Sequence, residues 1–298
     1  MKRTHQTLLQ SAFRIAKSTK AKAVLLFLDP LGELPDLEVP KGCALLFVTR
    51  KSKDELEGLF PDGLPASSPV VMLPKIDMTR IGLVKMAVAL AISNRLIELG
   101  DKIVFVAGHP ELNSLDAIFS LDTATESEIL TTQGVAGISE SVNPEVFQTA
   151  LAIALELASR GREGKPIGTI FVIGDEEKVL QLSKQMIINP FKGYSDDERN
   201  LLNPGLKETL REFSALDGAF VIGRDGLVLT AGRYLGAASD EATIPRGLGS
   251  RHIAASGITA MTQAIAIVIS ESTGDVRIFK NGKIIMEIEK PIRVPQAS

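Results

Sequence analysis

LDGAFVIGRDGLVLTAGRYL, residues 216–235, is typical of two β-strands joined by a tight turn. Its apolar runs flank GRDG, in which Gly226 can adopt the positive φ that such a turn requires. A second strand pair is predicted in AIAIVISESTGDVRIFKNGKIIMEIE (264–289), where Asn281 and Gly282 supply the turn. The second half of the chain is therefore predicted to contain antiparallel strand pairs.

A helix and a further strand precede these pairs. PEVFQTALAIALELASRG (144–161) predicts a helix, and GTIFVIGD (168–175) predicts a short strand. A helix and strands in this order are expected to form a mixed-sheet α/β domain.

The first half of the chain alternates short apolar runs with longer helical patterns. Helices are predicted at TRIGLVKMAVALAISNRLIELG (79–100), with Thr79 as N-cap and Gly100 at its end, and at SKDELEGLF (52–60). Four buried strands are predicted: AVLLFL (23–28), ALLFV (44–48), VVML (70–73) and KIVFVAG (102–108). This alternation predicts a mostly parallel sheet flanked by helices.

A polar stretch rich in Gly, Ser and Thr separates the two halves. DTATESEILTTQGVAGISESVNP (122–144) has weak periodicity, which is typical of a connection. We place the domain boundary near residue 140, which gives one α/β domain at 1–139 and a second at 140–298.

Composition limits the kinds of protein that the chain can be. It has 33 basic and 36 acidic side chains, and the formal charge of −3 gives no general attraction to nucleic acid or to an anionic membrane. No segment approaches the ~20 apolar residues that a membrane helix requires. Cys43 is the single cysteine, which excludes an internal disulfide, and within CALLFV it is interpreted as a small buried hydrophobe. We expect a soluble cytoplasmic protein with no nucleic-acid or membrane partner.

Candidate binding residues lie beside a strand start and a helix start. Asp217 precedes a strand, and Gly218 and Ala219 behind it leave room for a ligand to approach the backbone. The stretch GLGSRHIAASGIT (247–259) predicts a glycine-rich loop that enters a helix, with Ser250 able to cap it. The first amides and the dipole of such a helix favour an anion.

Charged side chains follow in the same region. Arg251 offers a planar guanidinium for phosphate oxygens, and His252 beside it offers a donor or a metal ligand. Ser270 and Glu271 stand at the end of a buried strand. An acid, an arginine–histidine pair at a helix start and a polar strand end together indicate metal-assisted phosphoryl or nucleotidyl transfer.

Each of these features also has a structural alternative. Asp-Gly commonly marks a turn, an Arg-His pair at a helix start is often a surface feature, and Ser-Glu after a strand is often solvated. We interpret His109, which precedes Pro110, as structural, and His5 as part of a frayed terminus.

Taken in order, the segments of the second half resemble the diadenylate cyclase domain, which condenses two ATP molecules into cyclic di-AMP. The resemblance covers about half of the chain and rests on GTIFVIGD (168–175), LDGAFVIGRDGLVLTAGRYL (216–235), LGSRHIAASGIT (248–259) and AIVISESTGDVRIFKNGK (266–283). NPFKGY (189–194) resembles the archaeal branch of that family. The resemblance implies ATP contacts at Gly218, Ala219, Leu235, Gly249, Ser250, Arg251, His252 and Ser270.

The resemblance also implies the chemistry of the site. Asp217, Arg251 and His252 would be catalytic. Asp217 would bind Mn²⁺ or Mg²⁺ and draw the proton from the attacking 3′-hydroxyl, while Arg251 and His252 would stabilise the phosphates. Glu271 is a second candidate metal ligand. Because each chain would hold one ATP, a face-to-face homodimer or a higher homo-oligomer is expected.

One departure from the family pattern favours a different interpretation of the site. Many members carry a second arginine directly after the histidine, where this chain has Ile253. Either another cation, for which Arg233 and Arg246 are candidates, compensates for the missing guanidinium, or the affinity for triphosphate is lower. The alternative is a sensor that binds ATP or a cyclic dinucleotide without turning it over.

The first domain resembles the C-terminal domain of pyruvate kinases in AKAVLLFLDP (21–30) and DKIVFVAGHPE (101–111), which is a likeness of fold that transfers no function. A regulatory role is left open. VTRKSKDE (48–55) runs from a strand into a helix, and its junction could hold an anionic effector at Thr49, Arg50, Lys51 and Ser52. A solvated helix start is the alternative.

Overall fold

The structure is a computed structural model that describes residues 3–34, 37–61, 63–76, 78–109, 114–125, 138–161, 167–236 and 247–290. The chain divides into two compact units, Met1–Thr132 and Gln133–Ser298. This division precedes the boundary predicted near residue 140, and that boundary and the roles given to the two domains stay predictions. No helix of the described residues is long and apolar enough to span a membrane.

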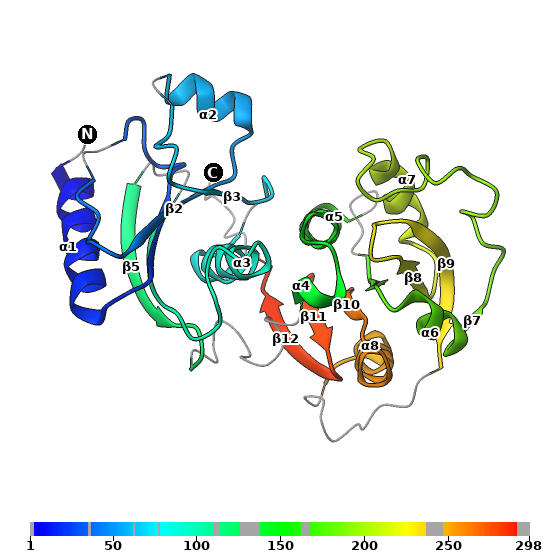
Figure 1. Cartoon of the computed structure of the whole chain (residues 1–298). Coiled ribbons are helices and arrows are strands. Elements are labelled where there is room, and N and C mark those ends of the chain that lie inside the picture. Colours follow the sequence, from blue (N-terminus) through cyan, green and yellow to red (C-terminus); the bar gives the residue numbers. More distant parts are fainter. Residues whose placement is uncertain are drawn as a thin grey trace, which may run out of the picture. The chain divides into compact units, whose positions relative to one another are not determined.

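The first unit is built on a five-stranded sheet in the order β3-β2-β1-β4-β5 (Figure 1). Its strands are β1 (Ala23–Phe27), β2 (Ala44–Thr49), β3 (Val70–Met72), β4 (Lys102–His109) and β5 (Ser114–Asp122). All neighbours run parallel except β5, which is antiparallel to β4, so the predicted mostly parallel sheet is confirmed. β5 was not predicted from the sequence, because this edge strand is only partly buried and lacks a continuous apolar run.

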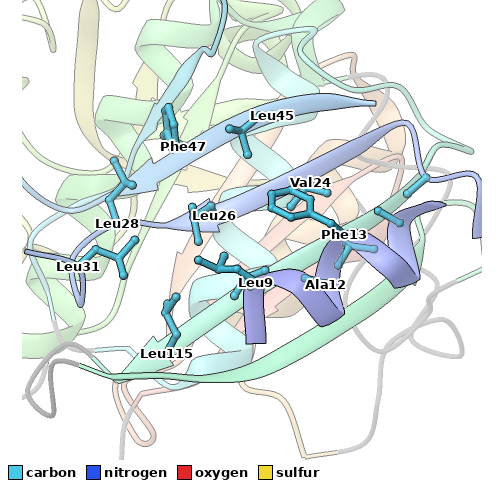
Figure 2. Close-up of a cluster of buried hydrophobic side chains, with 14 of the residues drawn as sticks. Leu9, Ala12, Phe13, Val24, Leu26, Leu28, Leu31, Leu45, Phe47 and Leu115 are labelled. Carbon is cyan, nitrogen blue, oxygen red and sulfur yellow. The ribbon is translucent and has the colours of Figure 1, made fainter. Parts of the chain in front are cut away.

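Helices cover this sheet, as predicted. They are α1 (Arg3–Thr19), α2 (Lys53–Leu59) and α3 (Arg80–Ser93). Leu9 and Phe13 of α1 pack with Val24 and Leu26 of β1 in the apolar cluster of Figure 2, and Leu56 of α2 joins the same cluster. α3 contacts β3 and β4 and lies across the sheet from α1 (Figure 1).

The helix predicted at 79–100 begins as expected and ends early. The side chain of Thr79 accepts a hydrogen bond from an amide of the first turn and so caps α3. The helix ends at Ser93 rather than at Gly100. Arg95 adopts a left-handed φ of 57°, a conformation in which an α-helix cannot continue.

Three side chains of this unit were given roles from the sequence. His5 is 4% exposed and its Nε2 accepts a hydrogen bond from the amide of Leu115 at 3.2 Å, so the prediction of a frayed terminus is wrong. Cys43 is only half-buried and packs against the apolar cluster. His109 is the last residue of β4, and its side chain lies outside the described residues.

The second unit is built on a seven-stranded mixed sheet in the order β12-β11-β10-β6-β8-β9-β7 (Figure 1). β6 and β8 run parallel and the other neighbours antiparallel, which confirms the predicted mixed sheet. The strands are β6 (Thr169–Ile173), β7 (Ser183–Gln185), β8 (Ala219–Ile222), β9 (Val228–Leu235), β10 (Ile265–Ile269), β11 (Val276–Lys280) and β12 (Lys283–Ile288).

Helices pack against this sheet as well. They are α4 (Ile138–Ser141), α5 (Pro144–Arg160), α6 (Glu176–Gln181), α7 (Leu206–Phe213) and α8 (Ser250–Met261). Ala255 and Ile258 of α8 and Val179 of α6 share one apolar cluster with Val172 and Val268 of the sheet. α5 contacts β10 and β11 and lies across these strands from α8 (Figure 1).

The turns between the predicted strand pairs form as the sequence indicates. Gly226 has a φ of 91°, and Asn281 and Gly282 have φ values of 50° and 76°. The connection predicted at 122–144 falls largely on residues 126–137, which lie outside the described ranges.

Candidate active site

Three strand ends meet at one edge of the seven-stranded sheet. Because β6 and β8 are parallel, their first residues are neighbours, and Ile170 pairs with Ala219. Because β10 is antiparallel to β6, its last residue Ile269 pairs with Thr169. The residues that flank these ends are Gly168, Asp217, Ser270 and Glu271. The fold therefore joins segments that are far apart in the sequence.

Helix α8 begins beside this edge. Its N-cap is Gly249, with φ −75° and ψ 177°, whereas Ser250 is the first helical residue, so the predicted cap at Ser250 is wrong. The carbonyl of Gly249 accepts the amide of His252 at 3.0 Å, which starts the helix one residue earlier than predicted. No side chain caps this end. A helix start without a side-chain cap favours an anion.

A cavity of about 440 Å³ lies at this helix start. Its wall is formed by residues 247–252 and 269–273 and by Arg277. The volume lies in the range of small-molecule sites. Seven residues predicted from the sequence line it: Gly247, Gly249, Ser250, Arg251, His252, Ser270 and Glu271.

Arg251 is held between two carboxylates. Its Nη1 donates to Oε2 of Glu271 at 2.9 Å, and its Nη2 lies 3.8 Å from Oδ1 of Asp217. Asp217 does not line the cavity, and its side chain is 94% exposed. A Cβ at Gly168 would lie 2.7 Å from Nη1 of Arg251 and 2.8 Å from Cβ of Glu271. Gly168, a site residue that the sequence analysis missed, thus leaves the space that Arg251 occupies.

His252 is buried and neutral at ordinary pH. It is 5% exposed, and burial lowers its pKa to about 4, with the positive charges of Arg277 and Arg251 acting in the same direction. Nη1 of Arg277 lies 3.2 Å from Nε2 of His252. Arginine can only donate, so Nε2 accepts and Nδ1 carries the ring proton. Nδ1 has no hydrogen-bond partner among the described residues.

Arg277 orients this histidine from β11. It is 8% exposed, and its Nη2 donates to Asp275 at 3.3 Å and to Glu287 on the neighbouring strand. Arg277 and Glu287 are directly paired residues of β11 and β12. Arg277 was not predicted from the sequence as a site residue. An arginine inside the buried run VRIFK was the available signal, because a charged residue is rarely buried without partners.

Four other predicted site residues pack or form hydrogen bonds within the seven-stranded sheet. Gly218 has a φ of 101°, and a Cβ there would lie 2.7 Å from the amide of Arg233, so strand β9 fills the space assigned to a ligand. Ala219 is fully buried, and Leu235 is 6% exposed within the apolar cluster. The guanidinium of Arg233 donates to Ser183 and to carbonyls at Leu180 and Ser183, so its predicted role in replacing a missing phosphate contact is wrong.

The remaining predicted residues take varied positions. Ser270 is 6% exposed, and its Oγ lies 3.3 Å from Oγ of Ser272. Gly247 has a φ of 95°, and a Cβ at this position would meet no described atom within 4 Å. Ile253 is half-buried on α8. Arg246 lies outside the described residues.

Comparison with known proteins identifies the family. Residues 156–284 match the family model described as "DisA bacterial checkpoint controller nucleotide-binding". A Haloferax volcanii protein named diadenylate cyclase is 43% identical over 147 residues, which cover 49% of this chain and 54% of that protein. The second unit belongs to the diadenylate cyclase domain family.

The likeness extends beyond the cyclase domain. A Methanocaldococcus jannaschii protein, also named diadenylate cyclase, is 36% identical over 200 residues, 67% of this chain and 63% of that protein. The chain thus spans less than two thirds of the curated relatives that it matches. Residues 4–131 match the family model described as "Probable sensor domain DacZ_P".

Solved structures are also similar to parts of the chain. Staphylococcus aureus DacA covers 49% of this chain at 24% identity with a TM-score of 0.36, and 87% of that structure is matched. A Cryptosporidium parvum pyruvate kinase covers 40% of this chain at 17% identity with a TM-score of 0.32, and 23% of that structure is matched.

The cyclase-family domain offers few ligands for a metal ion. No group of three or more His, Cys, Asp or Glu side chains suited to a metal occurs among the described residues. The exposed carboxylate of Asp217 and that of Glu271 flank the site. Mg²⁺ is commonly bound by one or two carboxylates together with substrate phosphates. This donor set fits a divalent ion that arrives with a nucleotide.

Proposed function

We propose that this protein is a diadenylate cyclase, which condenses two ATP molecules into cyclic di-3′,5′-AMP and releases two pyrophosphates. One observation carries the proposal. Arg251, anchored by Glu271, and the neutral His252 stand on the uncapped first turn of α8 at a cavity of about 440 Å³. Cationic, dipolar and hydrogen-bonding groups at one cavity suit a triphosphate.

The triphosphate binds at the start of α8. The first amides of the helix and the guanidinium of Arg251 contact its oxygens, and Nδ1–H of His252 donates to another oxygen. Arg251 exchanges its contact with Glu271 for the nucleotide, because phosphate carries more negative charge than a carboxylate. An unpaired buried donor costs free energy, so a ligand that accepts from Nδ1 of His252 is favoured.

Asp217 performs the proton transfer. Its exposed carboxylate accepts the proton of the 3′-hydroxyl of one ATP as that oxygen attacks the α-phosphorus of the other. The bond between the α-phosphorus and the bridging oxygen breaks, and pyrophosphate leaves. A Mn²⁺ or Mg²⁺ ion held by Asp217, with Glu271 as a second ligand, would offset the charge that develops on the phosphates. A second, symmetrical attack closes the ring.

Two chains must face each other for this reaction, because each chain has one such site. An apolar surface beside the site suits a second copy of the chain. Met186, Ile187, Ile188 and Tyr234 are 47%, 40%, 92% and 59% exposed. A Cβ at Gly232 would meet both Ile187 and the backbone oxygen of Asp217 within 4 Å, so this surface adjoins the site. Exposed apolar side chains that adjoin one another can mark a protein–protein interface.

A sensor that binds ATP without turnover is the second candidate. Ile253 replaces an arginine that many family members carry, and Arg233 is bound within the sheet. Incubation of the full chain with ATP and Mn²⁺, followed by chromatography, separates the two functions. A cyclase forms cyclic di-AMP and pyrophosphate, whereas a sensor binds ATP and forms neither.

A further inference from the structure

A second cavity is formed by residues of the first unit, whereas the candidate active site is formed by residues of the second unit. Its volume is about 750 Å³. It lies between the second half of α1 and residues 38–43, which lead into β2. The cavity thus stands at the amino ends of β1 and β2.

Four cations surround this cavity: Arg14, Lys17, Lys20 and Lys41. Among the described residues of the wall, Glu38 alone is acidic. None of the four cations forms an ion pair within the ranges that the structure describes. Like charges in one place repel one another, and the chain as a whole is acidic. An anionic ligand would remove this repulsion.

Lys20 adopts a strained backbone conformation at the cavity. Its φ is 55°, a left-handed value that glycine usually supplies after a helix end. The dipole of α1 favours Lys17 and Lys20 near its C-terminus. The dipole does not account for Arg14, which lies more than one turn before the end of α1 at Thr19. It also does not account for Lys41, which lies on another segment. A ligand shared by all four side chains accounts for the whole set.

The lining of the cavity includes a set of apolar residues, which we call its apolar floor. They are the buried Phe13, Ala16 and Ala21 and the half-buried Val39 and Pro40. An apolar floor with a cationic rim suits a molecule that has a hydrophobic or aromatic body and an anionic group. A volume of about 750 Å³ accommodates a molecule of nucleotide size.

The junction at residues 49–52, which the sequence left open as an anion site, already has hydrogen-bond partners within the chain. The carboxylate of Asp29 accepts from Oγ1 of Thr49 at 2.6 Å and from the amide and Nε of Arg50, both at 3.1 Å. Ser52 caps α2 in a reciprocal pair with Glu55. These donors therefore stabilise the fold through hydrogen bonds within the chain.

We propose that the cavity between α1 and residues 38–43 binds an organic phosphate of nucleotide size. Arg14, Lys17, Lys20 and Lys41 hold the phosphate groups, and the apolar floor holds the body of the molecule. The site is distinct from the one on α8 and does not depend on the proposed cyclase activity.

Cys43 reports on this cavity directly, because it lines the wall and is the single cysteine of the chain. Burial raises the pKa of its thiol, so labelling is done at mildly alkaline pH. The rate of thiol labelling of the full chain is measured with ADP, with inorganic pyrophosphate and with citrate. We expect ADP to slow labelling saturably, pyrophosphate to do so more weakly, and citrate to have no effect.

A paired set of variants locates the protection. Lys17→Gln with Lys41→Gln should weaken protection by ADP at least about tenfold, whereas Lys22→Gln with Lys53→Gln, which alter exposed lysines outside the cavity, should leave it unchanged. Arg251→Ala should also retain protection, because that residue lies at the other site. Absence of protection by ADP, protection by citrate alone, equal protection in both lysine pairs, or its loss in Arg251→Ala would each overturn the proposal.

Discussion

The guanidinium of Arg277 lies 3.2 Å from Nε2 of His252. This contact joins β11 to the first turn of α8 and sets the tautomer of the histidine, because arginine has no acceptor. It also places a positive charge beside the ring, which is one cause of the lowered pKa of His252. Arg277 is thus a positioning residue for the group that we propose to contact phosphate.

Arg277→Gln should raise the pKa of His252 above its value of about 4, because a positive charge beside the ring is removed. The KM for ATP should rise, since the ring is less firmly oriented. NMR titration of isotope-labelled histidine measures the pKa, and Lys283→Gln on the exposed start of β12 is the control. An unchanged pKa together with an unchanged KM would contradict the positioning role.

The free energy of unfolding should fall as the pH is lowered from about 6.5 to about 4. The unfolded histidine binds a proton near pH 6.5, whereas folded His252 resists protonation through burial and the nearby Arg277 and Arg251, against the opposing effects of the Gly249 backbone and of Asp275. The contribution of His252 to the free energy of unfolding is fully present above pH 6.5. It is lost as the pH falls from 6.5 to the folded pKa, and the loss amounts to up to about 3 kcal/mol. Denaturant titrations of the wild type and of His252→Gln measure it. Parallel pH profiles for the two proteins would contradict the account.

Most strands of both sheets, but not β5 or β7, and the residues of the α8 turn could be predicted from the sequence, because apolar runs and motif residues are local features. Arg251 and His252 are adjacent, so one motif contained both. Arg277 lies 25 positions after His252 and meets it only through the packing of α8 on β11. No local pattern contains a contact of that kind.

Gly218 and Gly168 also have neighbours in space that a local sequence pattern does not contain. The Asp-Gly-Ala motif marked Gly218 as open to a ligand, whereas the backbone of β9 lies against it. Gly168 was part of a predicted strand; its closeness to Glu271 follows from the pairing of β6 with β10, and its closeness to Arg251 follows from the contact of α8 with β6. Glycine in a sequence indicates close approach, but strand pairing decides which atoms approach.

Gly168→Ala should push the guanidinium of Arg251 out of the place that it occupies at the site, because the new Cβ would lie 2.7 Å from Nη1 of Arg251. We expect a loss of ATP affinity of about tenfold, the value of one charge-assisted contact, and a stability cost of about 1–3 kcal/mol from overpacking. Gly226→Ala is the control, since it is strained by a φ of 91° at the opposite end of β8. Equal ATP affinity in the two folded variants would contradict the proposed role of Arg251.

Ile188→Asp should weaken the proposed pairing of two chains, because a charge would replace a side chain that is 92% exposed beside the site. Specific activity at saturating ATP should then rise with protein concentration over a range at least about tenfold higher than in the wild type. Initial rates and light scattering across a dilution series measure this. Met261→Asp, at another exposed apolar position, is the control. Constant specific activity from a protein that remains a monomer would rule out paired sites.

The most direct test of the cyclase account measures both products in one sample. The full chain is incubated with ATP and Mn²⁺, and cyclic di-AMP and pyrophosphate are quantified for the wild type and for Asp217→Asn, with ATP binding measured in parallel. We predict two pyrophosphates per cyclic di-AMP for the wild type, and for the folded, ATP-binding variant a loss of both products by about 100-fold or more. ATP binding with neither product from the wild type, or full activity in Asp217→Asn, would contradict the account.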